Sequence, residues 1–90
     1  MSDFVEARYA VIVLRQAEIA SAEVAGEMIL RLASDLEFGS KSVLGHTSRA
    51  AAVKAIKTLA RDFQRSGRPS GALWSDAHAA ALAWYETARD

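Results

Sequence analysis

The sequence predicts an all-α fold, a compact bundle of three to four helices that forms one domain over residues 1–90. Apolar residues recur three and four positions apart through most of the chain, which is the period of an amphipathic helix. Nineteen of the 90 residues are alanine, the strongest helix former. The single proline and all but one of the five glycines lie in two short segments, residues 39–46 and 66–74, which we expect to be the connectors.

The first helical segment covers residues 4–37. Asp3 and Glu6 form the pattern of a capping box that opens a helix. An apolar stripe then continues in one register through Phe4, Ala7, Val11, Leu14, Ala25, Met28, Leu32 and Leu36. We expect one long helix, continuous or only bent. Because Glu18 and Ser21 interrupt the stripe, the alternative is a break near Ala20–Ser21, with Ser21 capping a second helix.

The first half of this segment is apolar on more than one side, because Ile12, Val13 and Ile19 lie off the stripe. A helix with a second apolar face has to bury that face too, either in the middle of the bundle or against another subunit. An alanine-rich core also buries little apolar area per residue, which leaves a 90-residue domain with a marginal core. Both observations predict a homodimer.

The central helix is predicted over residues 47–66. Thr47 or Ser48 caps its start, and Gly67 and Pro69 end it. At about 100° per residue, one face is apolar and another is cationic. The apolar face contains Ala52, Val53, Ile56, Leu59, Ala60 and Phe63. The cationic face contains Lys54, Lys57, Arg61, Gln64 and Arg65.

The last helix is predicted to start at Ser75, with Trp74 immediately before it and Asp76 in its first turn. Aromatic residues gather in this C-terminal part of the chain. We expect Trp84 to be buried as a filler of the alanine-rich core. Trp74 and Tyr85 are expected at a rim, where they can contact a partner.

Charge is segregated along the chain although the formal net charge is zero. Residues 1–38 contain seven acidic and three basic side chains, whereas residues 39–69 contain one acidic and seven basic ones. In the central helix Lys57, Arg61 and Arg65 follow one another at four-residue spacing, and such like-charge neighbours cost helix stability. An anion facing the basic helix would offset that cost.

Three kinds of anion are candidates. The first is a nucleic-acid backbone, which the basic face could follow together with Lys41, Arg49 and Arg68. The second is the acidic face of the first segment, where Glu23 and Glu27 could pair with the basic helix in the same chain or across the two-fold axis of a dimer. The third is an acidic patch on another protein. A solvated basic face without a partner is the structural alternative.

The segment Ser48 to Leu59, S-R-A-A-A-V-K-A-I-K-T-L, resembles the recognition helix of winged-helix regulators, in which Ser-Arg precedes Val and a basic, Leu-ending helix. The resemblance implies a DNA-binding helix. The chain departs from that pattern in an extra alanine before Val53, in a longer preceding connector and in having no strand pattern after Gly67. We therefore do not assign the chain to this family.

The sequence offers no pattern for enzyme chemistry. The chain has no cysteine, which excludes disulfides, thiolate metal sites and thiol catalysis. Its two histidines, His46 and His78, lack metal-ligand spacing. Ser75, Asp76 and His78 lie too close together on one helix start to adopt the geometry of a catalytic triad. We expect a protein that is not an enzyme and binds no metal or cofactor.

The N-terminus carries Asp3 and Glu6, where a signal peptide would carry basic residues. The charge-free apolar run from Tyr9 to Leu14 is too short for a membrane span. We therefore expect a cytoplasmic protein with no membrane partner.

Together these observations predict a small protein-binding module that acts as a regulator, inhibitor or adaptor through charge-segregated helical surfaces. The alternative is a nucleic-acid-binding protein that uses the basic central helix. The expected partners are another protein and a second copy of the chain. The predicted partner-binding residues are Lys54, Lys57, Arg61, Arg65, Glu23, Glu27, Trp74 and Tyr85.

Overall fold

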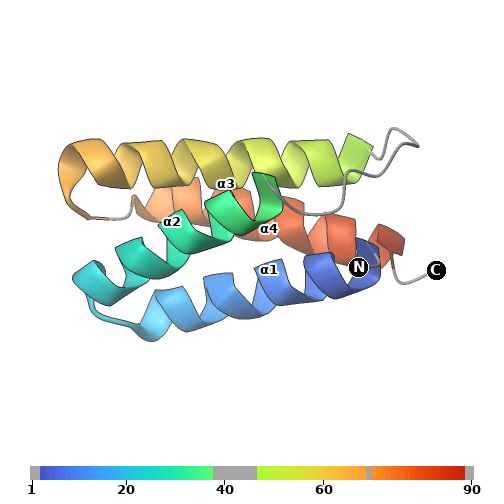
Figure 1. The fold of residues 1–90 in the computed structure, drawn as a ribbon, viewed down its shortest axis with the longest axis horizontal. Coiled ribbons are helices and arrows are strands. Elements are labelled where there is room, and N and C mark those ends of the chain that lie inside the picture. The colour runs from blue at the N-terminus through green and yellow to red at the C-terminus, as the bar shows by residue number, and fades with distance from the viewer. Residues whose placement is uncertain (1–2, 38–46, 69, 89–90) are drawn as a thin grey trace.

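The computed structural model describes residues 3–37, 47–68 and 70–88, and these residues form four α-helices and no strand. The helices are α1 (Asp3–Ile19), α2 (Ala22–Glu37), α3 (Thr47–Ser66) and α4 (Gly71–Ala88). Successive helices run in opposite directions, in a bundle that measures 35 × 20 × 20 Å (Figure 1). The predicted all-α bundle of three to four helices is confirmed.

Each helix packs against two others. α1 contacts α2 and α4, and α3 contacts the same two helices, so that α1 and α3 lie on a diagonal of the bundle. The outward faces of α1 and α3 therefore lie on opposite sides of the molecule.

The prediction of one continuous or bent helix over residues 4–37 is wrong, and the alternative break at Ala20–Ser21 is correct. The backbone amide of Val24 donates to Ser21 Oγ at 3.4 Å, and the amide of Ala25 donates to the Ser21 carbonyl at 2.8 Å. A straight helix over these residues would be about 51 Å long, longer than the bundle itself. By turning back, α2 instead packs its apolar stripe on the stripe of α1.

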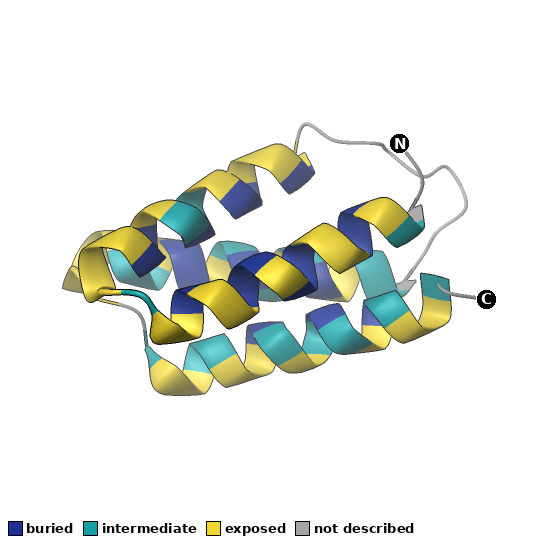
Figure 2. Ribbon diagram, turned by 90° about the horizontal axis from the view of Figure 1, so that it is seen from below, coloured by how far each residue is buried: buried dark blue, intermediate teal, exposed yellow. Residues whose placement is uncertain are grey.

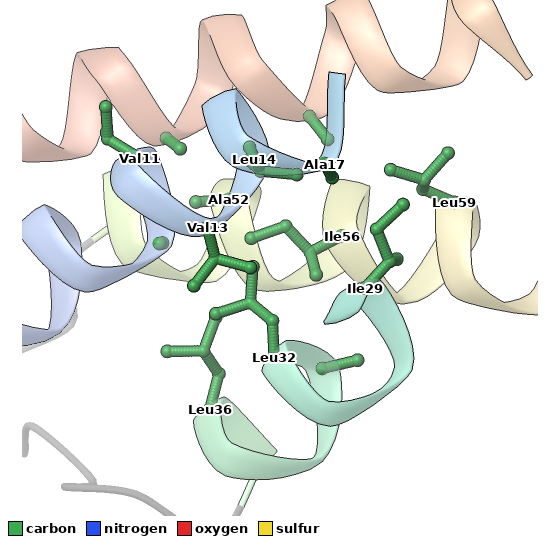
Figure 3. Close-up of a cluster of buried hydrophobic side chains, with 14 of the residues drawn as sticks. Val11, Val13, Leu14, Ala17, Ile29, Leu32, Leu36, Ala52, Ile56 and Leu59 are labelled. Carbon is green, nitrogen blue, oxygen red and sulfur yellow. The ribbon is translucent and has the colours of Figure 1, made fainter. Parts of the chain in front are cut away.

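The core runs along the axis of the bundle, and the buried residues line the inward sides of the helices (Figures 2 and 3). The largest fully buried side chains are Trp84, Leu14, Ile29, Leu32, Leu36, Ile56 and Leu59. The burial of Trp84 confirms its predicted role as a filler. Alanines without exposed surface occur on α1, α3 and α4 (Ala7, Ala10, Ala52, Ala77 and Ala81). These small side chains let the helices approach closely, so that few bulky residues suffice to fill the core.

One glycine determines how closely α2 and α3 approach. Gly26 is buried in the middle of α2, and a Cβ atom added there would overlap the end of the Phe63 ring. The aromatic ring therefore packs directly on the α2 backbone. Phe63 was expected on the apolar face of the central helix, and it is half-buried.

The connection between α3 and α4 is shorter than predicted. Gly67 ends α3 with a φ of 79°, and its amide donates to the Phe63 carbonyl at 2.8 Å, which confirms the predicted stop. α4 then starts at Gly71 and not at Ser75. Ser70 caps it, because Ser70 Oγ accepts from the Leu73 amide at 3.3 Å. Trp74 thus lies within the first turn of α4, where its side chain can reach α1.

Candidate protein-binding surface

The outward face of α3 brings together three of the four predicted basic residues. Lys54, Arg61 and Arg65 are exposed and lie within about 40° of one another around the helix axis. On the opposite side of the helix, Ile56 and Leu59 are completely buried. The burial of this apolar side fixes the rotation of α3, so the three cations point to solvent.

The fourth basic residue, Lys57, is turned toward α2. Its Nζ lies 3.7 Å from Glu37 Oε1, and the lysine side chain is 35% exposed. The last turn of α2 therefore supplies an anion for this lysine. Among the described residues, two ion pairs join the acidic first segment to α3: this one and the pair of Glu6 with Arg49.

The other cations of the outward face keep their charge toward solvent. Arg65 lies 3.8 Å from Asp62 of its own helix, but its side chain is 82% exposed. Lys54 and Arg61 have no ion pair within the described parts of the chain. Two adjoining open hollows follow this face, of about 370 and 470 Å³, and they share Thr58 and Arg61 in their linings.

Arg49, considered above as an extra phosphate contact, is directed into the bundle. Its Nε donates to Glu6 Oε1 at 3.3 Å and its Nη2 donates to the Leu36 carbonyl at 2.9 Å. Its guanidinium lies over the Trp84 ring, 5.8 Å from the centroid. The side chains of Arg49 and Glu6 are only 15% and 5% exposed. Arg49 of α3 thus contacts the other three helices through its guanidinium group.

The sequence did contain a signal for this buried pair. Glu6 stands four, seven and eleven residues before Ala10, Val13 and Ala17, all of which are buried on the inward side of α1. An acidic residue in such an apolar set has to find a cation inside the fold. The capping box predicted for Asp3 and Glu6 depends on the side chain of Asp3, which lies outside the described part of the structure.

The predicted acidic residues Glu23 and Glu27 are exposed on α2. Within the described residues, neither forms an ion pair with the basic helix. The structure therefore does not bring the predicted acidic and basic residues together within one chain. The acidic residues that do pair with α3 are Glu37, at the end of α2, and Glu6 of α1.

The two aromatic residues predicted at a rim are half-buried and form contacts within the chain. Trp74 Nε1 donates to the Leu14 carbonyl at 2.8 Å, and the indole stacks on the His78 ring with centroids 4.8 Å apart. The Tyr85 ring lies 5.4 Å from the Phe4 ring, centroid to centroid. Both residues therefore join α4 to α1. Trp74 also lines an open, largely apolar hollow of about 470 Å³ between α1, α2 and the start of α4.

Among the described residues no three His, Asp or Glu side chains converge in a way that could hold a metal ion. The buried Nε2 atom of His78 has no hydrogen-bond partner there, and His46 lies outside the described residues. None of the described helices has the length and apolar character that crossing a membrane requires.

No protein-family model matches this sequence, and neither the curated proteins nor the solved structures include a chain with significant similarity.

Proposed function

We propose that this protein is a small, non-enzymatic binding module of the cytoplasm, which acts as a regulator, inhibitor or adaptor by docking α3 on an acidic protein surface. The observation that carries the proposal is the row of Lys54, Arg61 and Arg65, which point to solvent on one side of α3, while Asp62 is half-buried at its border. The exposed residues beside them include the small side chains Ala50, Ala51 and Thr58, so a partner can approach the helix backbone closely.

The width of the basic surface favours a protein partner over duplex nucleic acid. α3 is bordered on one side by α2, whose exposed residues include Glu23 and Glu27. On the other side lies α4, where the charged residues in the described range are Asp76 and Glu86. Neighbouring helix axes lie about 8–10 Å apart, so a duplex laid on the cations would bring its phosphates over both acidic borders. A narrow acidic helix or loop of another protein avoids that repulsion.

Electrostatic complementarity of this kind sets orientation and association rate, and it is screened by salt. Lys57 contributes less to binding than the outward cations, because Glu37 already neutralises it. Trp74 and Tyr85 contact α1, the helix diagonal to α3, so in the proposal they support the fold and do not belong to the binding surface.

Affinity capture from cell lysate tests the proposal. The tagged wild-type chain, the variant Arg61→Glu and the matched control Arg31→Glu are compared with and without nuclease. Both variants change the net charge by the same amount, but the control alters an exposed cation of α2. We expect a stoichiometric protein partner that survives nuclease, is lost with the α3 variant and is retained by the control.

Two results would overturn the proposal. If the partner is retained by Arg61→Glu, α3 is not the binding surface. If nucleic acid is recovered and every protein is lost after nuclease, the nucleic-acid alternative is correct. Purified binding to duplex DNA would then show a log–log salt slope of about −2.7 for three neutralised phosphates.

A further inference from the structure

Exposed large apolar side chains are confined to one side of the bundle. In the described parts of the chain they all lie on α1 or at the start of α2. They are Val5, Tyr9, Ile12, Ile19 and Val24, with exposed fractions of 47, 39, 41, 87 and 49%. Of the three off-stripe residues that predicted a second buried face, only Val13 turns into the core. The other two, Ile12 and Ile19, are exposed, and a second subunit is one of the two ways in which we expect such residues to be buried.

The exposed residues of α1 have a regular spacing. Val5, Ile12 and Ile19 stand seven residues apart, so they form a stripe that drifts by only about 20° per step around the helix. β-branched residues repeated every seven positions are typical of the seam along which two helices pack. The buried residues Leu14 and Ala17 lie on the other side of α1, so the core does not use this stripe.

We propose that this stripe binds a second copy of the chain, with the two α1 helices packed antiparallel about a two-fold axis at Ile12. In that arrangement Ile12 meets Ile12 of the second copy, and Val5 meets Ile19. The stripe suits such pairing because its apolar residues are equally spaced on either side of Ile12. A two-fold interface has to be self-complementary in this way.

The available area is sufficient for a stable dimer. α1 has 17 residues and is about 25 Å long. Together with the exposed edge of α2, where Val24 lies, the face is about 20 Å wide. Contact over the whole face therefore covers about 1,000 Å² in total, which is the lower limit for a specific interface. Covering the stripe also adds apolar burial to a core that consists largely of alanine.

The charges beside the stripe distinguish this contact from binding at α3. Arg8 and Arg15 lie on one edge of the stripe. Around an antiparallel two-fold axis the same edges of both helices meet, so Arg8 lies between Arg15 and Glu18 of the second copy. Arg8 therefore faces one like and one opposite charge, so we expect added salt to leave dimerisation nearly unchanged. Binding of an acidic partner to α3 weakens with salt instead.

The inference goes beyond the proposed function and does not depend on it. Because α1 and α3 are diagonal, a dimer formed through α1 leaves both α3 faces free on its two outer sides. The protein would then present two identical binding surfaces, and a partner with two acidic sites would gain affinity through bivalency.

Sedimentation equilibrium tests the surface. The wild-type chain is expected at twice its 9.7 kDa mass. Because two-fold symmetry doubles every change, Ile12→Arg is expected to raise the dimer Kd by more than about 100-fold. Thr58→Arg on α3 adds the same charge on the far side and is expected to leave the dimer intact. A wild-type chain that stays monomeric up to about 0.5 mM, or an Ile12→Arg variant that is folded and still dimeric, would overturn the proposal.

Cysteine cross-linking tests the orientation without destabilising charges, since the natural chain has no cysteine. Under mild oxidation Ile12→Cys should give a covalent dimer, and a mixture of Val5→Cys and Ile19→Cys should give the mixed dimer. A Thr58→Cys control should stay monomeric under denaturing conditions. If Val5→Cys cross-links with itself in place of Ile19→Cys, the helices are parallel and the proposed arrangement is wrong.

Discussion

The ion pair between Glu6 and Arg49 offers the sharpest test of how this bundle is held together. Replacing Glu6 by Gln keeps the shape of the side chain but removes the negative charge beside a guanidinium that is only 15% exposed. Breaking one partner of a buried pair costs about 3–5 kcal/mol. Because Arg49 retains its bond to the Leu36 carbonyl and some contact with water, we expect the lower end, about 3 kcal/mol.

Urea denaturation followed by circular dichroism measures this loss. Small domains lose about 1 kcal/mol of stability per mol/L of urea, so a loss of about 3 kcal/mol lowers the midpoint by about 3 M. A loss of about 3 kcal/mol is a large part of the free energy of unfolding of a native protein, which is typically about 5–15 kcal/mol. Glu6→Gln is therefore measured at low temperature and, where needed, with a stabilising osmolyte.

Two further variants separate the buried pair from surface electrostatics. Glu37→Gln breaks the exposed pair with Lys57 and is expected to cost less than about 1 kcal/mol. The double variant Glu6→Leu/Arg49→Met replaces both charges by apolar groups and is expected to be neutral or stabilising. If Glu6→Gln costs no more than Glu37→Gln, the pair is not buried in solution and the reasoning fails.

Three other changes test separate parts of the fold. Gly26→Ala should destabilise the protein by about 1–3 kcal/mol, because overlap with the Phe63 ring outweighs the gain in helix propensity; in a Phe63→Ala background the same change should stabilise it by about 1 kcal/mol. Ser70→Ala should cost about 1 kcal/mol by removing the N-cap of α4, and Ser75→Ala should cost almost nothing. The partial burial of Tyr9, and then the hydrogen bond that its hydroxyl group donates to the Asp35 carboxylate, raise the pKa of Tyr9 above the ordinary 10.0. Ultraviolet titration should therefore show one tyrosine that ionises at a higher pH than a free tyrosine. The stabilisation that comes from the neutral Tyr9 hydroxyl group is present below pH 10 and is lost as the pH rises through the raised pKa.

Much of the fold followed from local patterns. The apolar period correctly assigned the buried side of α3, with Ile56 and Leu59 at its centre, and the burial of Trp84. It also placed Lys54, Arg61 and Arg65 together on the outward side. Their role in binding stays a prediction. These features depend only on the 3.6-residue period, which any segment of sequence displays by itself.

The errors came from interactions between segments. Ser21 carries the signal of a helix start, but the apolar residues resume the same register after it, and this favours one long helix. The register continues because both halves pack on the same core after the chain turns back. The predicted start of α4 at Ser75 is four residues late, because the sequence pattern placed Trp74 immediately before the helix. In the structure Trp74 lies within the first turn, and its indole reaches the Leu14 carbonyl from there.

The sequence by itself determined that the chain is helical, which side of each helix is apolar and where the positive charge accumulates. The tertiary structure decided which charges are free. Arg49 and Lys57 look equivalent to Arg61 in the sequence, but Arg49 is paired with Glu6 in the interior and Lys57 with Glu37. The physical reason is that helical periodicity is local, whereas the partner of a charge is set by which helices become neighbours, and that depends on the turns and on the packing of the whole bundle.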